Sequence, residues 1–281
     1  MDLNELELQK LIDRCLCEDL GAGDLTTNST AGTVSTGYIL AKEAGVVAGL
    51  PLAEMIFRRL DPSVEFRAIA RDGNRVERGL VLAEITGKAR AVLTGERLAL
   101  NFLQHLSGIA TRTARLVEMV SGEKARIVDT RKTTPGLRMI EKYAVRAGGG
   151  HNHRFGLSDA VLIKDNHIKM AGGIKKAVLA ARLGSPHTAR IEVEVEELAG
   201  VREALEAGAD IIMLDNMDPQ AMREAVDLVA GRALVEASGG IGEESIRRVA
   251  AAGVDLISVG ALTHSVRSLD ISLDLKETKR I

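Results

Sequence analysis

Basic side chains are concentrated in one part of the sequence, between positions 131 and 164. This segment holds seven lysine or arginine residues and two acidic ones, a local net charge of +5 in a chain whose total is -2. Such a concentration attracts a small polyanion, and arginine binds carboxylate or phosphate oxygens in pairs. We predict anion-binding roles for the four basic residues that adjoin expected strands or a glycine run: Arg131, Lys132, Arg154 and Lys164.

Other residues of the same segment allow simpler interpretations. Three of the basic residues have the four-residue spacing of a solvated helix face: Arg138, Lys142 and Arg146. His151 and His153 follow three consecutive glycines and suggest a metal pair, but alternate residues in a loop hold a metal only with further ligands. The sequence favours anion binding by His153 beside Arg154.

Two carboxylates end apolar runs in the second half of the chain. Glu194 and Asp215 each stand at the end of an expected strand, and the two strands are consecutive. Carboxylates in such a place can hold sugar hydroxyls, coordinate Mg²⁺ or stabilise a developing cation. A buried structural ion pair is the alternative interpretation.

Small residues follow the last two apolar runs, at Ser238, Gly239, Gly240 and Gly260. Glycines there let backbone N–H groups approach a phosphate, with help from the following helix N-terminus. Tight turns would explain the same glycines. Together with the basic cluster, the pattern predicts a phosphorylated sugar that carries a diphosphate, and a second anionic reactant.

The elements that must position these residues repeat as strand, loop and helix from residue 125 onward. The expected strands are 127–128, 161–163, 191–195, 211–214, 234–235 and 256–259. The later ends, at 194, 215, 238 and 260, have the spacing of βα units, which predicts a parallel sheet. Six units in series favour closure into a barrel, whose active site lies at the C-terminal ends of the strands.

The first 105 residues have a different pattern. Helical spacing over 3–20 and 52–60 is combined with short apolar runs between 37 and 91, which are separated by Gly, Pro and Asp. This part resembles an α+β sandwich, and one or two long helices are expected over 93–120. The fold class is therefore α/β, with an N-terminal α+β sandwich and a C-terminal TIM-like barrel.

Composition excludes several classes of function. A net charge of -2 and 2% aromatic residues disfavour nucleic-acid binding, and no apolar stretch is long enough for a membrane span. The two cysteines, Cys15 and Cys17, match no zinc pattern and are expected to be reduced thiols. The N-terminus has no apolar core of a signal peptide, so we expect a cytoplasmic protein without nucleic-acid or membrane partners.

Long ordered motifs make the chain resemble the quinolinate phosphoribosyltransferase family. They are EDLGAGDLTT (18–27), GERLALN (95–101), HLSGIAT (105–111), DTRKTTPGLR (129–138), EKYAV (141–145), GGGHNHR (148–154), LIKDNH (162–167) and EASGGI (236–241). The resemblance covers essentially the whole chain. It implies a sandwich domain over 1–105, joined by the tail 266–281, and an incomplete barrel over 106–265. It also implies that the alternating segment 269–275 returns to the N-terminal sheet.

The resemblance implies an enzyme that converts quinolinate and phosphoribosyl pyrophosphate to nicotinate mononucleotide, pyrophosphate and CO₂ in NAD synthesis, with Mg²⁺. It implies a homodimer in which the neighbouring subunit lends an arginine to the quinolinate pocket. The matching quinolinate residues are Arg97 (across the interface), Arg131, His153, Arg154 and Lys164. The matching phosphoribosyl pyrophosphate residues are Lys132, Glu194, Asp215, Ser238, Gly239, Gly240 and Gly260.

Within that set, the resemblance places Glu194 and Asp215 near Mg²⁺ and near the sugar. Lys164, Glu194 and Asp215 are the expected catalytic residues, and Lys164 or Arg131 would stabilise the carbanion left by CO₂. Three alternatives remain: a molybdenum-transport-associated homologue of the same fold, a non-catalytic phosphosugar sensor, and a phosphosugar aldolase or isomerase on a complete barrel.

Overall fold

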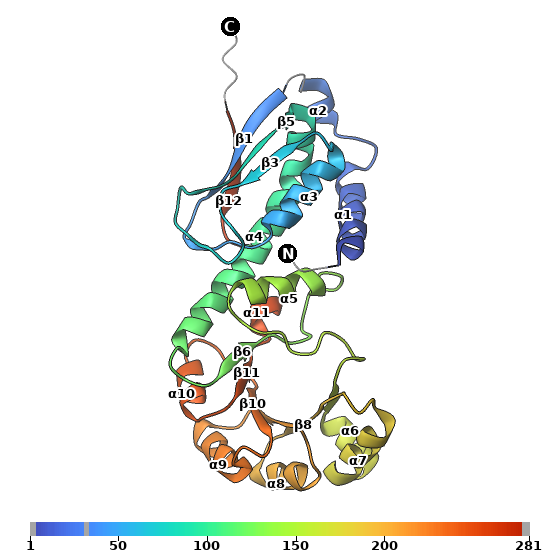
Figure 1. Cartoon of the computed structure of the whole chain (residues 1–281), viewed down its shortest axis with the longest axis vertical. Coiled ribbons are helices and arrows are strands. Elements are labelled where there is room, and N and C mark those ends of the chain that lie inside the picture. Colours follow the sequence, from blue (N-terminus) through green and yellow to red (C-terminus); the bar gives the residue numbers. More distant parts are fainter. Residues whose placement is uncertain (1–3, 31–33, 277–281) are drawn as a thin grey trace. The chain divides into compact units, whose positions relative to one another are not determined.

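Two large sheets, one antiparallel and one parallel, organise the chain in the computed structural model (Figure 1). The structure describes residues 4–30 and 34–276. It divides into two units that are each compact. The first takes in Met1–Ala114, Thr134–Gly149 and Ser265–Ile281, and the second Arg115–Thr133 and Gly150–His264.

The first unit is built on a four-stranded antiparallel sheet. Its strands β1 (Val34–Ala41), β3 (Glu65–Ala68), β5 (Val81–Lys88) and β12 (Ile271–Leu275) lie in the order β12-β1-β5-β3. The predicted return of the tail is confirmed, because β12 pairs antiparallel with β1 from Gly37 opposite Leu275 to Ala41 opposite Ile271. A small ribbon of β2 (Gly45–Val46) and β4 (Arg75–Val76) is separate from this sheet.

Alternate residues of β1 are buried, so one face of the sheet needs a cover. Helix α3 lies against α1, and both bury apolar side chains such as Leu8, Ile12, Ile56 and Phe57. The helices of this unit are α1 (Glu5–Leu20), α2 (Leu25–Thr30), α3 (Leu50–Leu60), the first part of α4 (Ala89–Met119) and α5 (Arg138–Ala147). The segment expected to hold one or two helices is thus the single helix α4.

Helix α5 carries the basic residues that were expected on a solvated helix face. The helix is present, and Arg146 is exposed, but Lys142 is buried. The helical part of that interpretation is therefore confirmed, whereas the solvated face is wrong for Lys142. The helix lies within Thr134–Gly149, a segment that belongs to the first unit.

The second unit is built on a six-stranded parallel sheet in the order β6-β11-β10-β9-β8-β7. Its strands are β6 (Arg126–Val128), β7 (Val161–Ile163), β8 (Ile191–Val195), β9 (Ile211–Asp215), β10 (Leu234–Ser238) and β11 (Leu256–Ser258). Its helices are α6 (Asp165–Ala171), α7 (Ile174–Gly184), α8 (Leu198–Glu206), α9 (Pro219–Val229), α10 (Ile246–Ala251) and α11 (Ala261–His264). The predicted series of βα units and the incomplete barrel are confirmed.

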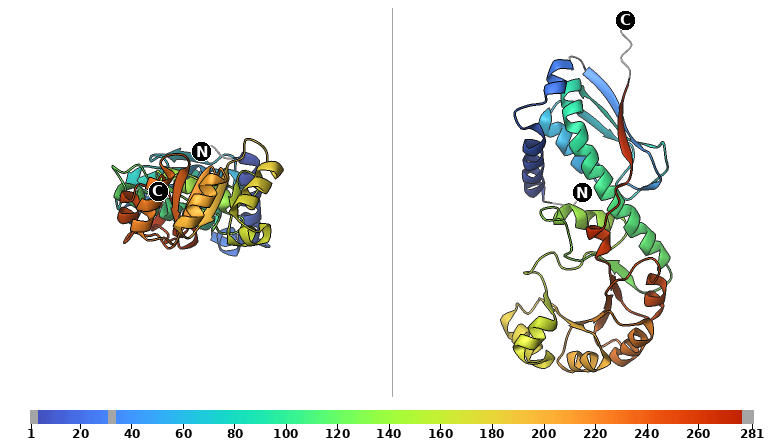
Figure 2. Two further views of the ribbon diagram at one scale, coloured as in Figure 1. Left: turned by 90° about the horizontal axis from the view of Figure 1, so that it is seen from below. Right: turned by 180° about the vertical axis from the view of Figure 1, so that it is seen from behind.

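The helices α7, α8 and α9 surround the strands of this sheet on the outside, as both directions of view show (Figure 2). Val193, Ile212 and Ala237 are fully buried between them, as expected of strands in a parallel sheet covered by helices. No helix in the described ranges is both long enough and apolar enough to span a bilayer.

Candidate active site

The C-terminal ends of the parallel strands form one edge of the sheet, and nearly all predicted site residues lie there. Arg131 and Lys132 follow β6, Lys164 follows β7, Glu194 lies in β8, Asp215 ends β9, Ser238 ends β10 before Gly239 and Gly240, and Gly260 follows β11. The exception is Arg97, an exposed residue of α4 in the first unit.

An isolated bridge brings the histidine segment to the same edge. His151 pairs in parallel with Val128 of β6, and its N–H donates to the Ile127 carbonyl at 2.8 Å. Because the pairing is parallel, the residues after His151 run alongside those after Val128. His153 and Arg154 therefore lie beside the loop that carries Arg131.

Lys132 and Gly260, which were predicted from different motifs, lie in contact. A Cβ atom on Gly260 would come within 2.9 Å of Lys132 Cδ, so a side chain at position 260 would displace the lysine stem from the turn. The Thr263 hydroxyl donates to the Lys132 carbonyl at 2.7 Å and holds the loop in place. The stem of the Lys132 side chain thereby lies against a turn that was predicted to bind phosphate.

Asp215 and Gly239 are linked through Asn216. The Asn216 side-chain amide donates to Asp215 Oδ2 at 2.8 Å, and its backbone N–H donates to the Ser238 carbonyl at 3.0 Å. Asn216 has a φ of 54°, in the left-handed region that asparagine adopts more readily than most residues other than glycine. A Cβ on Gly239 would lie 2.6 Å from Asn216 Cγ. Only glycine at 239 therefore leaves room for the amide that orients Asp215.

Lys164 and Glu194 form an ion pair across the ends of β7 and β8. The lysine side chain is about half exposed at 46%, whereas the glutamate side chain is 16% exposed. The Lys164 backbone N–H donates to His167 Nδ1 at 3.0 Å, at the start of α6. Two residues that were expected to be catalytic thus hold each other at the strand ends.

Arg131 and Arg154 lie close enough for their charges to interact. The pKa of Arg154 is lowered by burial and, next, by the positive charge of Arg131, while Glu192 and Asp159 oppose the shift. The Arg131 Nε is buried and has no hydrogen-bond partner in the described part of the chain. A ligand with more than one negative charge would offset the repulsion between these two half-buried guanidinium groups.

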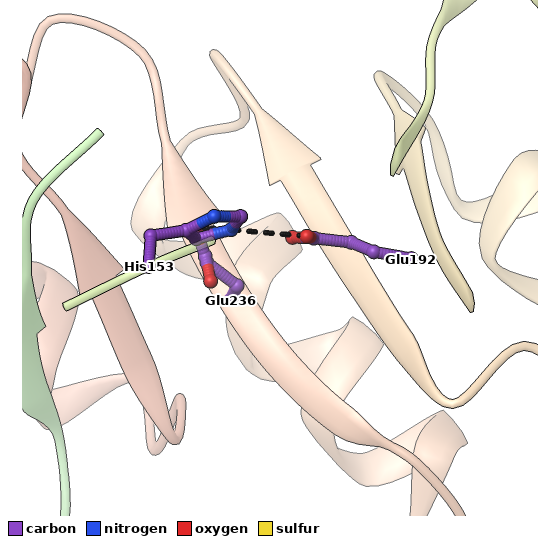
Figure 3. A group of neighbouring side chains, drawn as sticks. All are labelled: His153, Glu192 and Glu236. Atoms are coloured by element: carbon purple, nitrogen blue, oxygen red, sulfur yellow. Dashed lines mark ion pairs between the residues drawn. The ribbon is translucent and has the colours of Figure 1, made fainter. Parts of the chain in front are cut away.

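The His153 ring lies beside two buried carboxylates of the barrel strands (Figure 3), and its side chain is 12% exposed. Its Nε2 lies 3.0 Å from Glu192 Oε2 and 3.6 Å from Glu236 Oε1. Glu192 is 3% exposed and Glu236 is fully buried. Burial, and next the negative charge of Glu192, raise the pKa of Glu236 to about 8, so this carboxyl is protonated at neutral pH.

The three groups have the spacing of a possible metal site, since one ligand atom from each lies within 4.8 Å of the others. The hydrogen bond at His153 Nδ1 argues against a metal at this cluster. This nitrogen accepts the backbone N–H of Arg154 at 2.8 Å, so the ring proton lies on Nε2, the atom that a metal between the carboxylates would need. The cluster therefore fits a hydrogen-bonded group better than a metal centre.

A third buried carboxylate supports the same segment from the end of β6. The fully buried Asp129 accepts the backbone N–H of His153 at 2.8 Å and the Asn152 amide at 2.6 Å. The basic edge of the sheet thus lies above a layer of acidic side chains.

Sequence reasoning assigned no role to four of these residues: Asp129, Glu192, Asn216 and Glu236. The sequence did contain a signal for Glu192 and Glu236. Each stands two positions before a predicted site residue of the same strand, and residues two apart in a strand point to the same face. An acidic residue within a strand buried on both sides, two positions before a site residue, marks a second polar layer beneath the first.

Comparison with known proteins gives a family for both parts of the chain. Residues 24–107 match the sequence model of the N-terminal domain of quinolinate phosphoribosyl transferase, and residues 109–274 match that of its C-terminal domain. A Bacillus subtilis protein named probable nicotinate-nucleotide pyrophosphorylase [carboxylating] is 49% identical over 274 residues, covering 97% of this chain and 95% of its own.

Solved structures agree with this result. The structure of NadC from Streptococcus pyogenes is 46% identical, with a TM-score of 0.94, and the match covers 98% of this chain and 99% of that one. The nicotinate-nucleotide pyrophosphorylase from Francisella tularensis is 40% identical, with a TM-score of 0.94 and 98% of each chain covered.

The raised pKa of Glu236 predicts a pH-dependent effect of Glu236→Gln on stability. The unfolded carboxyl releases its proton near 4.5 and the folded one near 8. The contribution of Glu236 to the free energy of unfolding therefore falls as pH rises from 4.5 to 8. Glutamine stays neutral, so we expect E236Q to gain on the order of 3 kcal/mol relative to wild type between pH 5 and pH 8.

Urea unfolding at both pH values measures this difference. Glu206→Gln, at an exposed position on α8, is the matched control and should show no pH-dependent gain. A constant difference between E236Q and wild type at the two pH values would contradict a buried, protonated Glu236.

Proposed function

This chain belongs to the quinolinate phosphoribosyl transferase family, and we propose that the polar edge of its parallel sheet is the active site. The chain is a decarboxylating phosphoribosyltransferase of NAD biosynthesis. It joins quinolinate to phosphoribosyl pyrophosphate and yields nicotinate mononucleotide, pyrophosphate and CO₂. The roles of individual residues below are our proposals.

The observation that carries the assignment is the pair of mutually repelling guanidinium groups, Arg131 and Arg154. Quinolinate carries two adjacent carboxylates on one ring, and bidentate arginines suit such a ligand. Binding it offsets the repulsion between the two cations. The half-exposed ammonium of Lys164 lies on the same edge and completes the cationic pocket in this proposal, with Arg97 supplied by a second subunit.

Phosphoribosyl pyrophosphate would bind at the neighbouring strand ends. Lys132 is held against the turn at Gly260, where it would face phosphate oxygens. Ser238, Gly239 and Gly240 form the other turn, in which glycine backbone can approach the 5′-phosphate. Glu194 and Asp215 are then the carboxylates nearest the ribose.

The oxygen donors of Glu194 and Asp215 also fit Mg²⁺. This ion takes one or two carboxylates together with substrate phosphates and water, and Asp215 has its carboxylate oriented by Asn216. When bound, Mg²⁺ would neutralise charge on the departing pyrophosphate.

The residues of the chain contribute mainly by positioning and by charge. The arginines hold the pyridine nitrogen toward C1 of the sugar against the repulsion between two polyanions. Glu194 and Asp215 stabilise the positive charge that develops on the ribose as pyrophosphate leaves. After the new C–N bond forms, the C–CO₂ bond breaks, and Lys164 or Arg131 supplies the positive charge that stabilises the carbanion left by CO₂. A proton from solvent then converts this carbanion to the C–H of nicotinate mononucleotide.

A turnover assay tests the reaction directly. Purified protein with quinolinate, phosphoribosyl pyrophosphate and Mg²⁺ should form nicotinate mononucleotide, measured by chromatography, and nicotinate in place of quinolinate should give none. Binding of phosphoribosyl pyrophosphate without product would favour the phosphosugar sensor or the molybdenum-associated homologue.

Two further proposals concern assembly and location. We propose a homodimer in which Arg97 of each subunit completes the site of the other, because this exposed residue lies in a family motif on α4. We also propose a cytoplasmic enzyme, which its two free cysteines suit.

The shared site predicts complementation between inactive variants. Arg97→Ala and Arg154→Ala should each lose most activity, and a refolded equal mixture should regain up to about a quarter of the wild-type rate, since mixed dimers have one intact site. A mixture of Arg131→Ala and Arg154→Ala is the control and should stay inactive, because both residues lie on one sheet edge. Equal recovery of activity in both mixtures, or no recovery in either, would contradict the proposal that Arg97 acts in the active site of the other subunit.

The contact between Gly239 and Asn216 predicts a substrate-specific defect. Gly239→Ala should displace the Asn216 amide from Asp215 and raise the KM for phosphoribosyl pyrophosphate about tenfold or more, with a smaller effect on the KM for quinolinate. Gly242→Ala, at a glycine with open space around its Cβ position, is the matched control. Steady-state kinetics with each substrate varied in turn would check this, and equal KM values in G239A and wild type would refute it.

A further inference from the structure

Both ring nitrogens of His153 are engaged by the protein itself. The Nδ1 atom accepts the backbone N–H of Arg154 at 2.8 Å, and the Nε2 atom lies 3.0 Å from Glu192 Oε2, with Glu236 Oε1 at 3.6 Å (Figure 3). An imidazolium donates from both nitrogens and could not accept from Arg154. These contacts therefore require a neutral ring with its proton on Nε2.

A neutral ring held in this way does not bind a substrate carboxylate as a cation. It does fix the position of the next residue, because its Nδ1 satisfies the backbone N–H of Arg154. The side chain of Arg154 has an independent contact with the protein, from Nη1 to the Ala160 carbonyl at 3.2 Å. The histidine ring thus fixes the backbone of Arg154, and the Ala160 carbonyl fixes its guanidinium group.

The segment needs such support because it has no regular structure of its own. Residues 152–155 lie in neither a helix nor a strand. Their position is set by side chains of the barrel strands: Asp129 at the end of β6 accepts the His153 N–H, and Glu192 in β8 and Glu236 in β10 surround the ring. Precise binding groups on loops depend on this kind of second layer.

We propose that His153 is a positioning residue, kept as the neutral Nε2–H tautomer by a hydrogen bond to Glu192, and that it acts on quinolinate by fixing Arg154. Glu192 is then a positioning residue as well, through the oxygen that accepts the ring proton. This proposal rests on the proposed function for the identity of the anion. The state of the ring, in contrast, is a property of the protein without substrate.

Nitrogen-15 NMR of the histidine side chains tests the ring state without any activity measurement. The chain has six histidines, and the signals of His153 are those that disappear in His153→Gln. At neutral pH we expect one protonated nitrogen, Nε2, and one unprotonated nitrogen, Nδ1. An imidazolium or an Nδ1–H tautomer would overturn the proposal, even in a protein that turns over quinolinate normally.

Two variants of Glu192 separate hydrogen bonding from charge. Glu192→Gln keeps an oxygen that can accept the ring proton, so we expect the tautomer to persist and the KM for quinolinate to stay within about threefold of wild type. Glu192→Ala removes the acceptor, so we expect that KM to rise about tenfold or more, with less change in the KM for phosphoribosyl pyrophosphate. Equal losses in both variants would overturn the proposal in favour of a purely electrostatic role.

Three controls complete the test. Glu206→Gln and Glu206→Ala, at an exposed position of α8, should leave both KM values unchanged. Saturable Mn²⁺ or Zn²⁺ binding by the wild type that is lost in Glu192→Gln would overturn the proposal, because it would place a metal on Nε2. If the turnover assay gives no product while NMR shows the Nε2–H tautomer, the proposed function fails and the ring assignment stands.

Discussion

Like charges held close together are the constraint on which this site depends. Arg131 and Arg154 lie close enough for their charges to repel each other, and this repulsion acts whenever no anion is bound between them. Buried acidic groups beneath them offset part of this repulsion, since Glu192 raises the pKa of Arg154. Too many negative charges would cancel the attraction for substrate. Glu236 avoids this cost because its carboxyl is protonated below about pH 8.

The barrel strands therefore carry two polar layers with different tasks. The outer layer, at the strand ends, includes Glu194, Asp215 and Ser238 and is open to ligands. The inner layer, two residues earlier on β8 and β10, holds Glu192 and Glu236 away from water. Its members make contact with the loop that bears Arg154 rather than with solvent. Polar groups in such an interior are stable only while they have partners, which ties the shape of the loop to the strands.

Much of the outer layer could be predicted from sequence, because a charged or glycine residue after an apolar run marks a strand end. The contact of Lys132 with Gly260 then follows from the order of the strands, in which β6 pairs with β11. The inner layer left a weaker signal, an acidic residue two positions before a site residue, and its contacts could not be predicted because they depend on which strands and loops lie opposite one another. Lys142 shows the same limit: its spacing indicates a helix, but only the packing of α5 decides that its face is buried.

The way β12 completes the first sheet has a consequence for synthesis on the ribosome. Strand β1 is translated early, yet the partner on one of its edges, β12, emerges only after the entire parallel sheet has been made. Throughout that interval β1 offers unpaired backbone groups at an open edge, a template for association with other nascent chains. The parallel sheet, whose strands are consecutive in the second unit, can form before this edge is closed. Chaperone contacts during elongation are thus most useful to the part of the chain that is translated first.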